Sequence, residues 1–157
     1  MRLTSPAFQQ ASSFPIKCTC DGENASPELA WKGAPAGTKF YALLMHDPDA
    51  PRWGGFTHWV VYNIPASFDA LPPNVPAQRE LSGFCVQGKN DSGSVGYTGP
   101  CPPSGTHRYT VRLYALDAEL NLKPGASPQE FKDAIRGHVL EQAELMGTYA
   151  RTANKAA

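Results

Sequence analysis

Apolar, aromatic and β-branched residues gather in four segments of the chain, each bounded by Gly, Pro, Asn or Asp. These segments cover residues 39–47, 56–64, 80–88 and 107–116. Such composition between such boundaries is typical of β-strands. The stretches that separate them are rich in Pro, Gly and Asn, which favours ordered loops over helices. The pattern therefore predicts a mostly β fold.

The segment that begins at Ser127 has a different pattern, which predicts a helix extending to residue 151. Ser127 is a candidate cap, Pro128 suits the first helical position, and Glu130 can complete a capping box. Gly137 weakens the middle of this helix, and Gly147 is placed to end it. Its apolar positions recur at helical spacing, at Phe131, Ile135, Val139 or Leu140, Ala143 and Met146. We expect a mostly β domain closed by this C-terminal helix.

Length and charge narrow the class of protein. A chain of 157 residues without an internal repeat or linker predicts one domain, residues 1–157. The formal net charge is zero, so no overall field attracts nucleic acid, and any bound anion must be held locally. The N-terminus lacks the apolar stretch of a signal peptide, and no segment is long and apolar enough to span a bilayer. We therefore expect a cytoplasmic protein without stable membrane insertion.

The four cysteines are Cys18, Cys20, Cys85 and Cys101. In a reducing cytoplasm we expect free thiols rather than disulfides, and Cys101, between two prolines, is expected to be a small packing residue. The single residue between Cys18 and Cys20 does not match the spacing of a zinc module. We accordingly expect neither a metal nor a cofactor.

Three of the predicted strands carry polar residues at one end of their apolar face. Alternation along 107–116 places His107 and Tyr109 on the apolar face and Arg108 on the other. The same count places Asp47 in line with Leu43 and Met45, and His58 in line with Val60, Tyr62 and Ile64. His46 points away from Asp47 and His138 falls in the predicted helix, so both are expected to be surface or packing residues.

Two readings of these polar residues remain open. Prolines stiffen the segment around Asp47 and Asp49, which could simply cap a tight loop through their own backbone amides. A single histidine is more often a core residue bonded to a carbonyl than a ligand. Together, however, carboxylate, two imidazoles and a phenol beside a Gly-Pro-rich loop predict a small polar pocket for phosphate or carboxylate. No arginine fork is apparent there, so weak binding through a few hydrogen bonds is expected.

Three stretches carry a family resemblance: "DPDAP" at 47–51, "HWVVYNIP" at 58–65 and "GPCPPSGTHRY" at 99–109. In these motifs the chain resembles the phosphatidylethanolamine-binding proteins, the family that includes Raf kinase inhibitor protein. "CTCDGENASPELAW" and "GHVLEQAELMGTY" are similar to its shorter bacterial Raf kinase inhibitor-like branch. The resemblance covers nearly the whole chain and implies a β fold of two antiparallel sheets with a small anion-binding cavity at one end.

The resemblance also implies which residues bind the ligand. Those that match the family's pocket motif are Asp47, Asp49, His58, Pro103, His107 and Tyr109, and those that match its loop are Gly99 and Pro100. It further implies a cis peptide bond between Ala50 and Pro51. Animal members carry a longer loop with an additional Trp and His, where this chain has Phe56 and Thr57. The shape of the ligand near that wall is therefore left open.

Three functions follow as hypotheses. The first is a binding or regulatory protein, not an enzyme, that holds a phosphate or other small anionic head group and modulates a kinase or protease partner. The second is a low-activity hydrolase using the His and Asp side chains, although Ser104 and Thr106 are poor candidates for its nucleophile. The third is a kinase or protease inhibitor acting through surface loops such as 65–79. The resemblance to the bacterial branch also implies a homodimer, although no interface can be identified in the apolar pattern.

Overall fold

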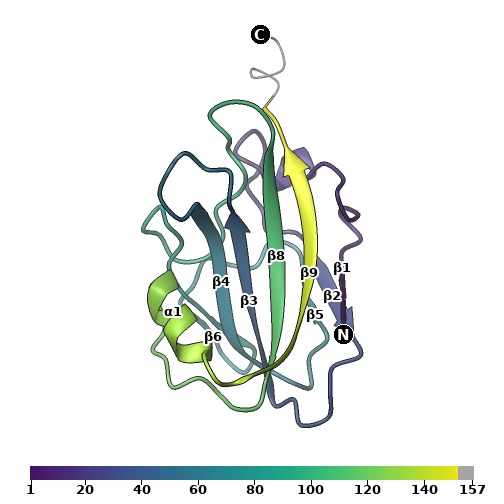
Figure 1. Cartoon of the computed structure of the whole chain (residues 1–157), viewed down its shortest axis with the longest axis vertical. Coiled ribbons are helices and arrows are strands. Elements are labelled where there is room, and N and C mark those ends of the chain that lie inside the picture. Colours follow the sequence, from purple (N-terminus) through teal and green to yellow (C-terminus); the bar gives the residue numbers. More distant parts are fainter. Residues whose placement is uncertain (152–157) are drawn as a thin grey trace.

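Two antiparallel sheets form the framework of the chain, shown in Figure 1 as a computed structural model that describes residues 1–151. The larger sheet has the strand order β6-β7-β4-β3-β8-β9, and the smaller has the order β1-β2-β5. The larger comprises β6 (Glu80–Leu81), β7 (Cys85–Gln87), β4 (Phe56–Pro65), β3 (Phe40–Asp47), β8 (His107–Leu116) and β9 (Val139–Tyr149). The smaller comprises β1 (Arg2–Thr4), β2 (Leu29–Lys32) and β5 (Ala70–Leu71). The predicted mostly β fold of two antiparallel sheets is confirmed; residues 152–157 of the predicted domain lie outside the described residues.

The long strands coincide with the apolar segments of the sequence. Strands β3, β4 and β8 match the predicted segments 39–47, 56–64 and 107–116 to within one residue. Segment 80–88 instead contains two short strands, β6 and β7, that are joined by a turn. Strands β1, β2 and β5 were not predicted, because two to four residues are too few to show a periodic pattern.

The C-terminal helix α1 (Pro128–Ile135) begins as predicted and is shorter than predicted. Its capping box is present, with the Glu130 amide donating to Ser127 Oγ and the Ser127 amide donating to the Glu130 carboxylate. The helix ends before Gly137, whose φ of 84° is left-handed. The predicted helical continuation is wrong: residues 139–149 form β9, which pairs with β8 along its whole length. His138 therefore lies between α1 and β9.

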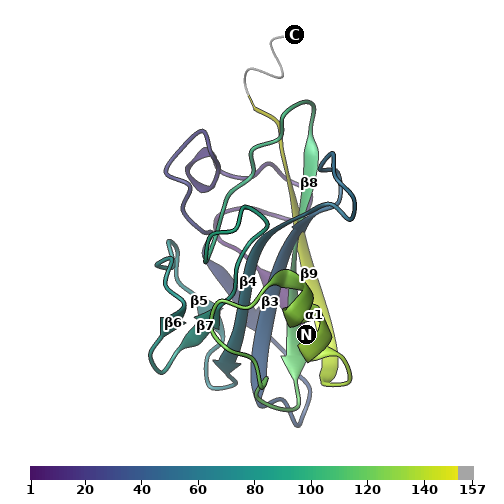
Figure 2. The same ribbon diagram turned by 90° about the vertical axis from the view of Figure 1, so that its left-hand side faces the viewer.

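Strands β3 and β4 of the larger sheet are buried on both faces, between α1 on one side and the smaller sheet on the other (Figure 2). Leu43 and Met45 of β3 pack in the core that contains β2. Ala42 and Leu44 alternate with them and pack with Phe131 of α1. This double cover explains why β3 is a nearly continuous apolar run, and it leaves the polar end of the strand as the place where a site can form.

Two irregularities in β4 change which side chains share a face. Met45 pairs with Trp59 and His46 with Thr57, so His58 is an extra residue at a bulge. A similar shift lies further along β4, between the pairs Tyr41–Ile64 and Leu43–Val61. The predicted alignment of His58 with Val60 and Tyr62 is therefore wrong, because the bulge reverses the alternation on which it rested. Ile64, beyond the second shift, packs in the same core as Tyr109.

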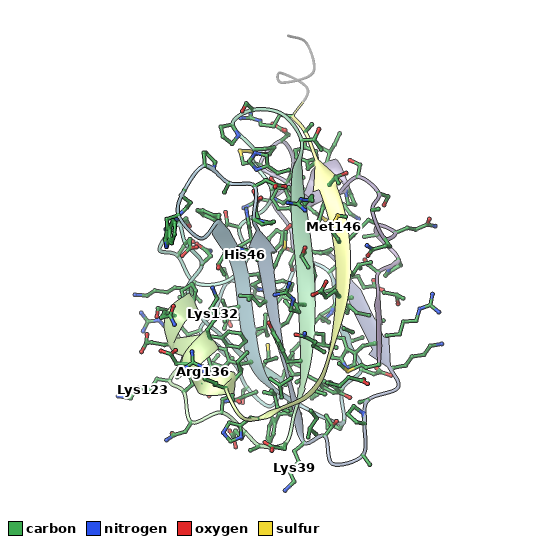
Figure 3. All side chains as sticks on the ribbon, viewed as in Figure 1. Lys39, His46, Lys123, Lys132, Arg136 and Met146 are labelled. Carbon is green, nitrogen blue, oxygen red and sulfur yellow. A yellow bond between two sulfur atoms is a disulfide. The ribbon has the colours of Figure 1, made fainter. Side chains whose placement is uncertain are left out.

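His46 lies on the other side of the larger sheet from the cavity described below. Figure 3 shows it above Lys132 of α1. Burial and, secondarily, the Lys132 charge lower the pKa of this imidazole.

Within residues 1–151 no helix is long and apolar enough to cross a membrane.

Candidate functional site

A cavity of about 250 Å³ lies at one end of the larger sheet, where β3, β4 and β8 meet the loops 48–55 and 97–106. Six of the eight residues predicted to bind a ligand line it: Asp47, His58, Gly99, Pro103, His107 and Tyr109. They come from three strands and a loop that are far apart in the sequence. The fold thus brings together most of the residues that the sequence singled out.

Asp47 and His107 form the most buried charged pair of the cavity. The Nδ1 atom of His107 lies 2.7 Å from Oδ2 of Asp47, and the two side chains are only 9% and 4% exposed. The other carboxylate oxygen of Asp47 accepts the amide of Asp49 at 2.7 Å. Because a carboxylate accepts the Nδ1 hydrogen, the ring of His107 is held with Nε2 as its remaining polar atom.

His58 is fixed by a carbonyl group instead of a carboxylate. Its Nδ1 donates to the Thr98 carbonyl oxygen at 2.6 Å. Since a carbonyl oxygen only accepts, Nδ1 carries the hydrogen, and Nε2 of the neutral ring is an acceptor. Burial lowers the pKa of this imidazole, although its hydrogen bond to Thr98 acts in the opposite direction. The neutral ring with a free acceptor is therefore the favoured form.

Tyr109 stands between the two histidines. Its ring centroid is 5.2 Å from that of His58 and 6.4 Å from that of His107. The residue is 1% exposed, and burial, followed by the charges of Asp47 and Asp49, raises the pKa of the phenol. The hydroxyl therefore keeps its hydrogen and can donate. Among residues 1–151 it forms no hydrogen bond, and the same holds for Nε2 of His58 and of His107.

Asp49 and Pro100 support the cavity without lining it. Asp49 accepts the Arg108 amide and two guanidinium hydrogen bonds, at 2.8 to 2.9 Å. The Arg108 side chain is the main cause that lowers the pKa of Asp49 to about 2. The Pro100 carbonyl accepts the Cys20 amide at 3.1 Å. Asp49 thus ties loop 48–55 to β8, and Pro100 ties loop 97–106 to the N-terminal segment.

Two cysteines are joined beside the cavity, so the prediction of four free thiols is wrong. Cys20 and Cys101 form a disulfide with a Cα–Cα distance of 5.4 Å, and Cys101 lines the cavity. No feature of the sequence indicates that these two residues, 81 positions apart, meet. Cys18 and Cys85 are the buried free thiols. Among residues 1–151 no group of three His, Cys, Asp or Glu side chains could hold a metal ion.

The predicted cis bond between Ala50 and Pro51 is also wrong, because no peptide bond of residues 1–151 is cis. Trans is the favoured isomer before proline. Here the turn closes through two hydrogen bonds, from the Asp49 amide to Asp47 Oδ1 and from the Arg52 amide to the Ala50 carbonyl, at 2.7 and 2.8 Å. These bonds shape the loop without the rarer isomer.

The structure adds an arginine that the sequence reasoning missed. Arg52 lines the cavity, its guanidinium carbon 5.5 Å from the ring centroid of Phe56. The expectation that no arginine stands at the site is therefore wrong. The available signal was the position of Arg52 directly after the "DPDAP" motif, in a loop that had to lie near Asp47.

Comparisons with known proteins agree with this architecture. A family model described as phosphatidylethanolamine-binding protein matches residues 4–150. A UPF0098 protein of Methanothermobacter thermautotrophicus is 52% identical, over 96% of this chain and 99% of its own length. A UPF0098 protein of Aquifex aeolicus is 46% identical, over 96% and 89%.

Two solved structures have the same fold. One is a putative phosphatidylethanolamine-binding protein homolog, CT736, of Chlamydia trachomatis, with a TM-score of 0.87 and 38% identity over 96% of this chain and 97% of that one. The other is YbcL of E. coli, described as a new member of the mammalian family, with a TM-score of 0.89 and 32% identity over 96% and 98%.

Proposed function

Since the chain belongs to the phosphatidylethanolamine-binding protein family, we propose that it is a binding protein whose cavity holds a small anion such as phosphate. The family resemblance inferred from the sequence is confirmed. The anion, the residues that hold it and the absence of catalysis are our proposal.

One observation carries this proposal: three polar atoms of almost fully buried side chains face the cavity without a partner. They are Nε2 of His58, Nε2 of His107 and the hydroxyl of Tyr109, on residues that are 6%, 7% and 1% exposed. No hydrogen bond among residues 1–151 engages them. Among these residues the fully buried side-chain N or O atom without a partner is Nε1 of Trp31, so the three cavity atoms are accessible from the cavity, where a ligand or water meets them.

The polarity and size of the cavity favour a small oxyanion. The Tyr109 hydroxyl donates, and His107 donates from Nε2 when its ring is protonated beside Asp47. His58 accepts, which suits a ligand that itself carries a hydrogen, as inorganic phosphate does at neutral pH. A volume of about 250 Å³ is slightly below the usual range for drug-sized ligands. A head group fits this space better than a larger metabolite.

A second function, slow hydrolysis, is favoured by the Asp47–His107 pair. A carboxylate that orients Nδ1 leaves Nε2 as a general base, as in catalytic triads. Among the described residues that line the cavity, Cys101 is in a disulfide, no serine is present, and Thr98 supplies an aliphatic hydroxyl. A hydrolase would therefore need either Thr98 or an activated water as its nucleophile. We propose binding as the function and hydrolysis as the alternative to be tested beside it.

The experiment is a calorimetric titration of the protein with inorganic phosphate and with phosphoethanolamine at fixed ionic strength. Wild type is compared with Tyr109→Phe, which removes one donor and keeps the ring packing. We expect saturable binding that weakens several-fold in Tyr109→Phe, with no ethanolamine released overnight. Release of ethanolamine by wild type would favour the hydrolase, and absence of heat at millimolar ligand would contradict both. The kinase or protease partner, the homodimer and the cytoplasmic location remain predictions.

A further inference from the structure

Arg52 is placed at the mouth of the cavity by a tight loop. Its amide donates to the Ala50 carbonyl at 2.8 Å, and Gly55 donates to the Arg52 carbonyl at 3.1 Å. Gly54 and Gly55 have φ values of 77° and 76°, and a Cβ on Gly55 would stand 2.4 Å from the carbonyl oxygen of Asp47. The turn that follows Asp47 is therefore closed tightly, and it carries Arg52 against the cavity.

A series of tilted and edge-to-face ring contacts connects the Arg52 guanidinium with the buried donors. Its central carbon lies 5.5 Å from the Phe56 centroid, Phe56 lies 4.7 Å from His58, and His58 lies 5.2 Å from Tyr109. A guanidinium that rests on an aromatic face keeps its N–H groups in its own plane, free to donate sideways. The contact with Phe56 thus orients the cation without using its hydrogen-bond donors.

The carboxylate nearest to Arg52 holds it weakly. Nη1 of Arg52 is 4.0 Å from Oδ2 of Asp91, and the same oxygen already accepts the Thr57 amide at 2.7 Å. Arg108 makes an informative contrast, since two of its side-chain nitrogens bind Asp49 at 2.9 and 2.8 Å. The guanidinium of Arg108 is therefore occupied by Asp49. The side chain of Arg52 is 48% exposed, and its guanidinium is available to a ligand.

We propose that Arg52 makes the anion site select its ligands by charge. Arg52 leaves Asp91 and donates hydrogen bonds to two oxygens of a bound anion. Doubly charged tetrahedral oxyanions therefore bind more tightly than singly charged anions. The inference rests on the proposed function, because it concerns the same cavity. It adds a residue that acts at the mouth, where the ligand's outer oxygens lie, while Tyr109 and His107 act at the base. Hydrogen bonds between charged partners are the strongest of such contacts.

The test compares Arg52→Gln, Arg52→Lys and the control Arg136→Gln, whose residue pairs with Asp133 on the surface of α1. For Arg52→Gln we expect phosphate affinity to fall tenfold or more, with a smaller loss for Arg52→Lys and none for the control. Arg52→Gln should also lose most of the preference for phosphate over acetate. The dependence of phosphate affinity on salt should weaken in Arg52→Gln and not in the control.

A second readout uses the neighbouring tryptophan. Trp53 is fully exposed, whereas Trp31 and Trp59 are buried, so movement of the loop should alter the Trp53 emission. We expect phosphate to change the fluorescence of wild type and to leave that of Arg52→Gln unchanged. If wild type binds phosphate and Arg52→Gln binds it within twofold, with the same preference over acetate, the role of Arg52 is overturned while the proposed function stands. If wild type binds no phosphate, both are overturned.

Discussion

Oδ2 of Asp47 lies 2.7 Å from Nδ1 of His107, and both side chains are more than nine-tenths buried. The carboxylate fixes the orientation of the imidazole through this hydrogen bond, and removal of either side chain leaves the buried polar atom of the other without a partner. The pair is therefore both part of the proposed binding site and a structural element beneath it. Variants at Asp47 should affect both properties.

Asp47→Asn keeps the shape of the side chain and removes its charge. We expect phosphate affinity to fall about tenfold, because an amide oxygen holds the Nδ1 hydrogen of His107 less strongly than a carboxylate does, and the ring loses its fixed orientation. The free energy of unfolding should fall by about 1 to 3 kcal/mol. Calorimetry and urea unfolding measure the two effects. Asp133→Asn, on the surface of α1, is the matched control and should change neither.

The fixed hydrogen on Nδ1 of His58 predicts discrimination between phosphate and sulfate. Phosphate at neutral pH carries a hydroxyl that can donate to Nε2 of His58, whereas sulfate carries none. At pH 7.5 we expect phosphate to bind at least several-fold more tightly. As the pH falls through the folded-state pKa of His58, which burial lowers, sulfate should gain affinity because the ring becomes protonated. Equal affinity for the two anions at pH 7.5 would refute the assignment of Nε2 as an acceptor.

Burial of neutral His58 also makes stability depend on pH. Its pKa is lowered in the folded protein, mainly by burial, so the unfolded chain binds more protons below about pH 6.5. This contribution to the free energy of unfolding is complete above pH 6.5 and is lost as the pH falls through the folded-state pKa. Urea unfolding between pH 7.5 and 5 should show the decline, and His58→Gln should show a shallower one. The same slope in both proteins would contradict this prediction.

The disulfide between Cys20 and Cys101 should stabilise both the fold and the cavity wall. The Cys20→Ser/Cys101→Ser variant is expected to lose about 2 to 4 kcal/mol of unfolding free energy, since it frees a long loop in the unfolded chain. Phosphate affinity should fall several-fold, because Cys101 lines the cavity. Cys18→Ser is unsuitable as a control because that residue is buried. Wild type reduced by a dithiol should reproduce the double variant.

Thiol labelling provides an independent check on the same bond. Burial raises the pKa of Cys85 to about 12 and also raises that of Cys18. Neither free thiol should react with a thiol reagent while the protein is folded. Native wild type should therefore label at no cysteine before reduction and at Cys20 and Cys101 after it. Labelling of Cys20 or Cys101 in the unreduced protein would show that the disulfide does not form.

Gly99 is a position where a methyl group should impair the site without touching its polar atoms. A Cβ there would lie 2.2 Å from the Cys18 carbonyl oxygen and 2.6 Å from Asn24 Oδ1, which accepts the Gly99 amide. Gly99→Ala must therefore move the loop, and with it the Thr98 carbonyl that holds His58. We expect phosphate affinity to fall at least fivefold. Ser104→Ala, in the same loop and exposed, should bind as wild type does.

The long strands could be predicted because each is a run of eight or more mainly apolar, aromatic and β-branched residues between turn formers, and most of the cavity residues stand at the ends of these runs. The C-terminal segment shows the limit of this signal. Apolar residues at Ala143, Leu145 and Tyr149 fit an alternating strand, while others in the segment fit a helix. What decides between them is the long edge of β8, which offers a partner for ten of the eleven residues of β9, all but Leu140 at a register shift. The secondary-structure propensity of one segment carries no information about the strand edge with which that segment can pair.

Two features of the site could not be read from the sequence for related reasons. A bulge at His58 sends that side chain to the opposite face, and periodicity carries no sign of one extra residue. The disulfide depends on the approach of two loops, which is a consequence of the whole fold. The chemistry-bearing residues were therefore predictable as a set, and their orientations were not.

The most direct test of the central claim is nitrogen NMR of the histidine rings during a phosphate titration of wild type. His138, exposed and paired with Asp117, serves as an internal control. We predict a hydrogen on Nδ1 of His58 in the free protein. During the titration, the ring-nitrogen signals of His58 and His107 should shift along one saturation curve, while those of His138 stay unchanged. If the two cavity rings stay unchanged at millimolar phosphate, or shift only as His138 does, the cavity is not the anion site.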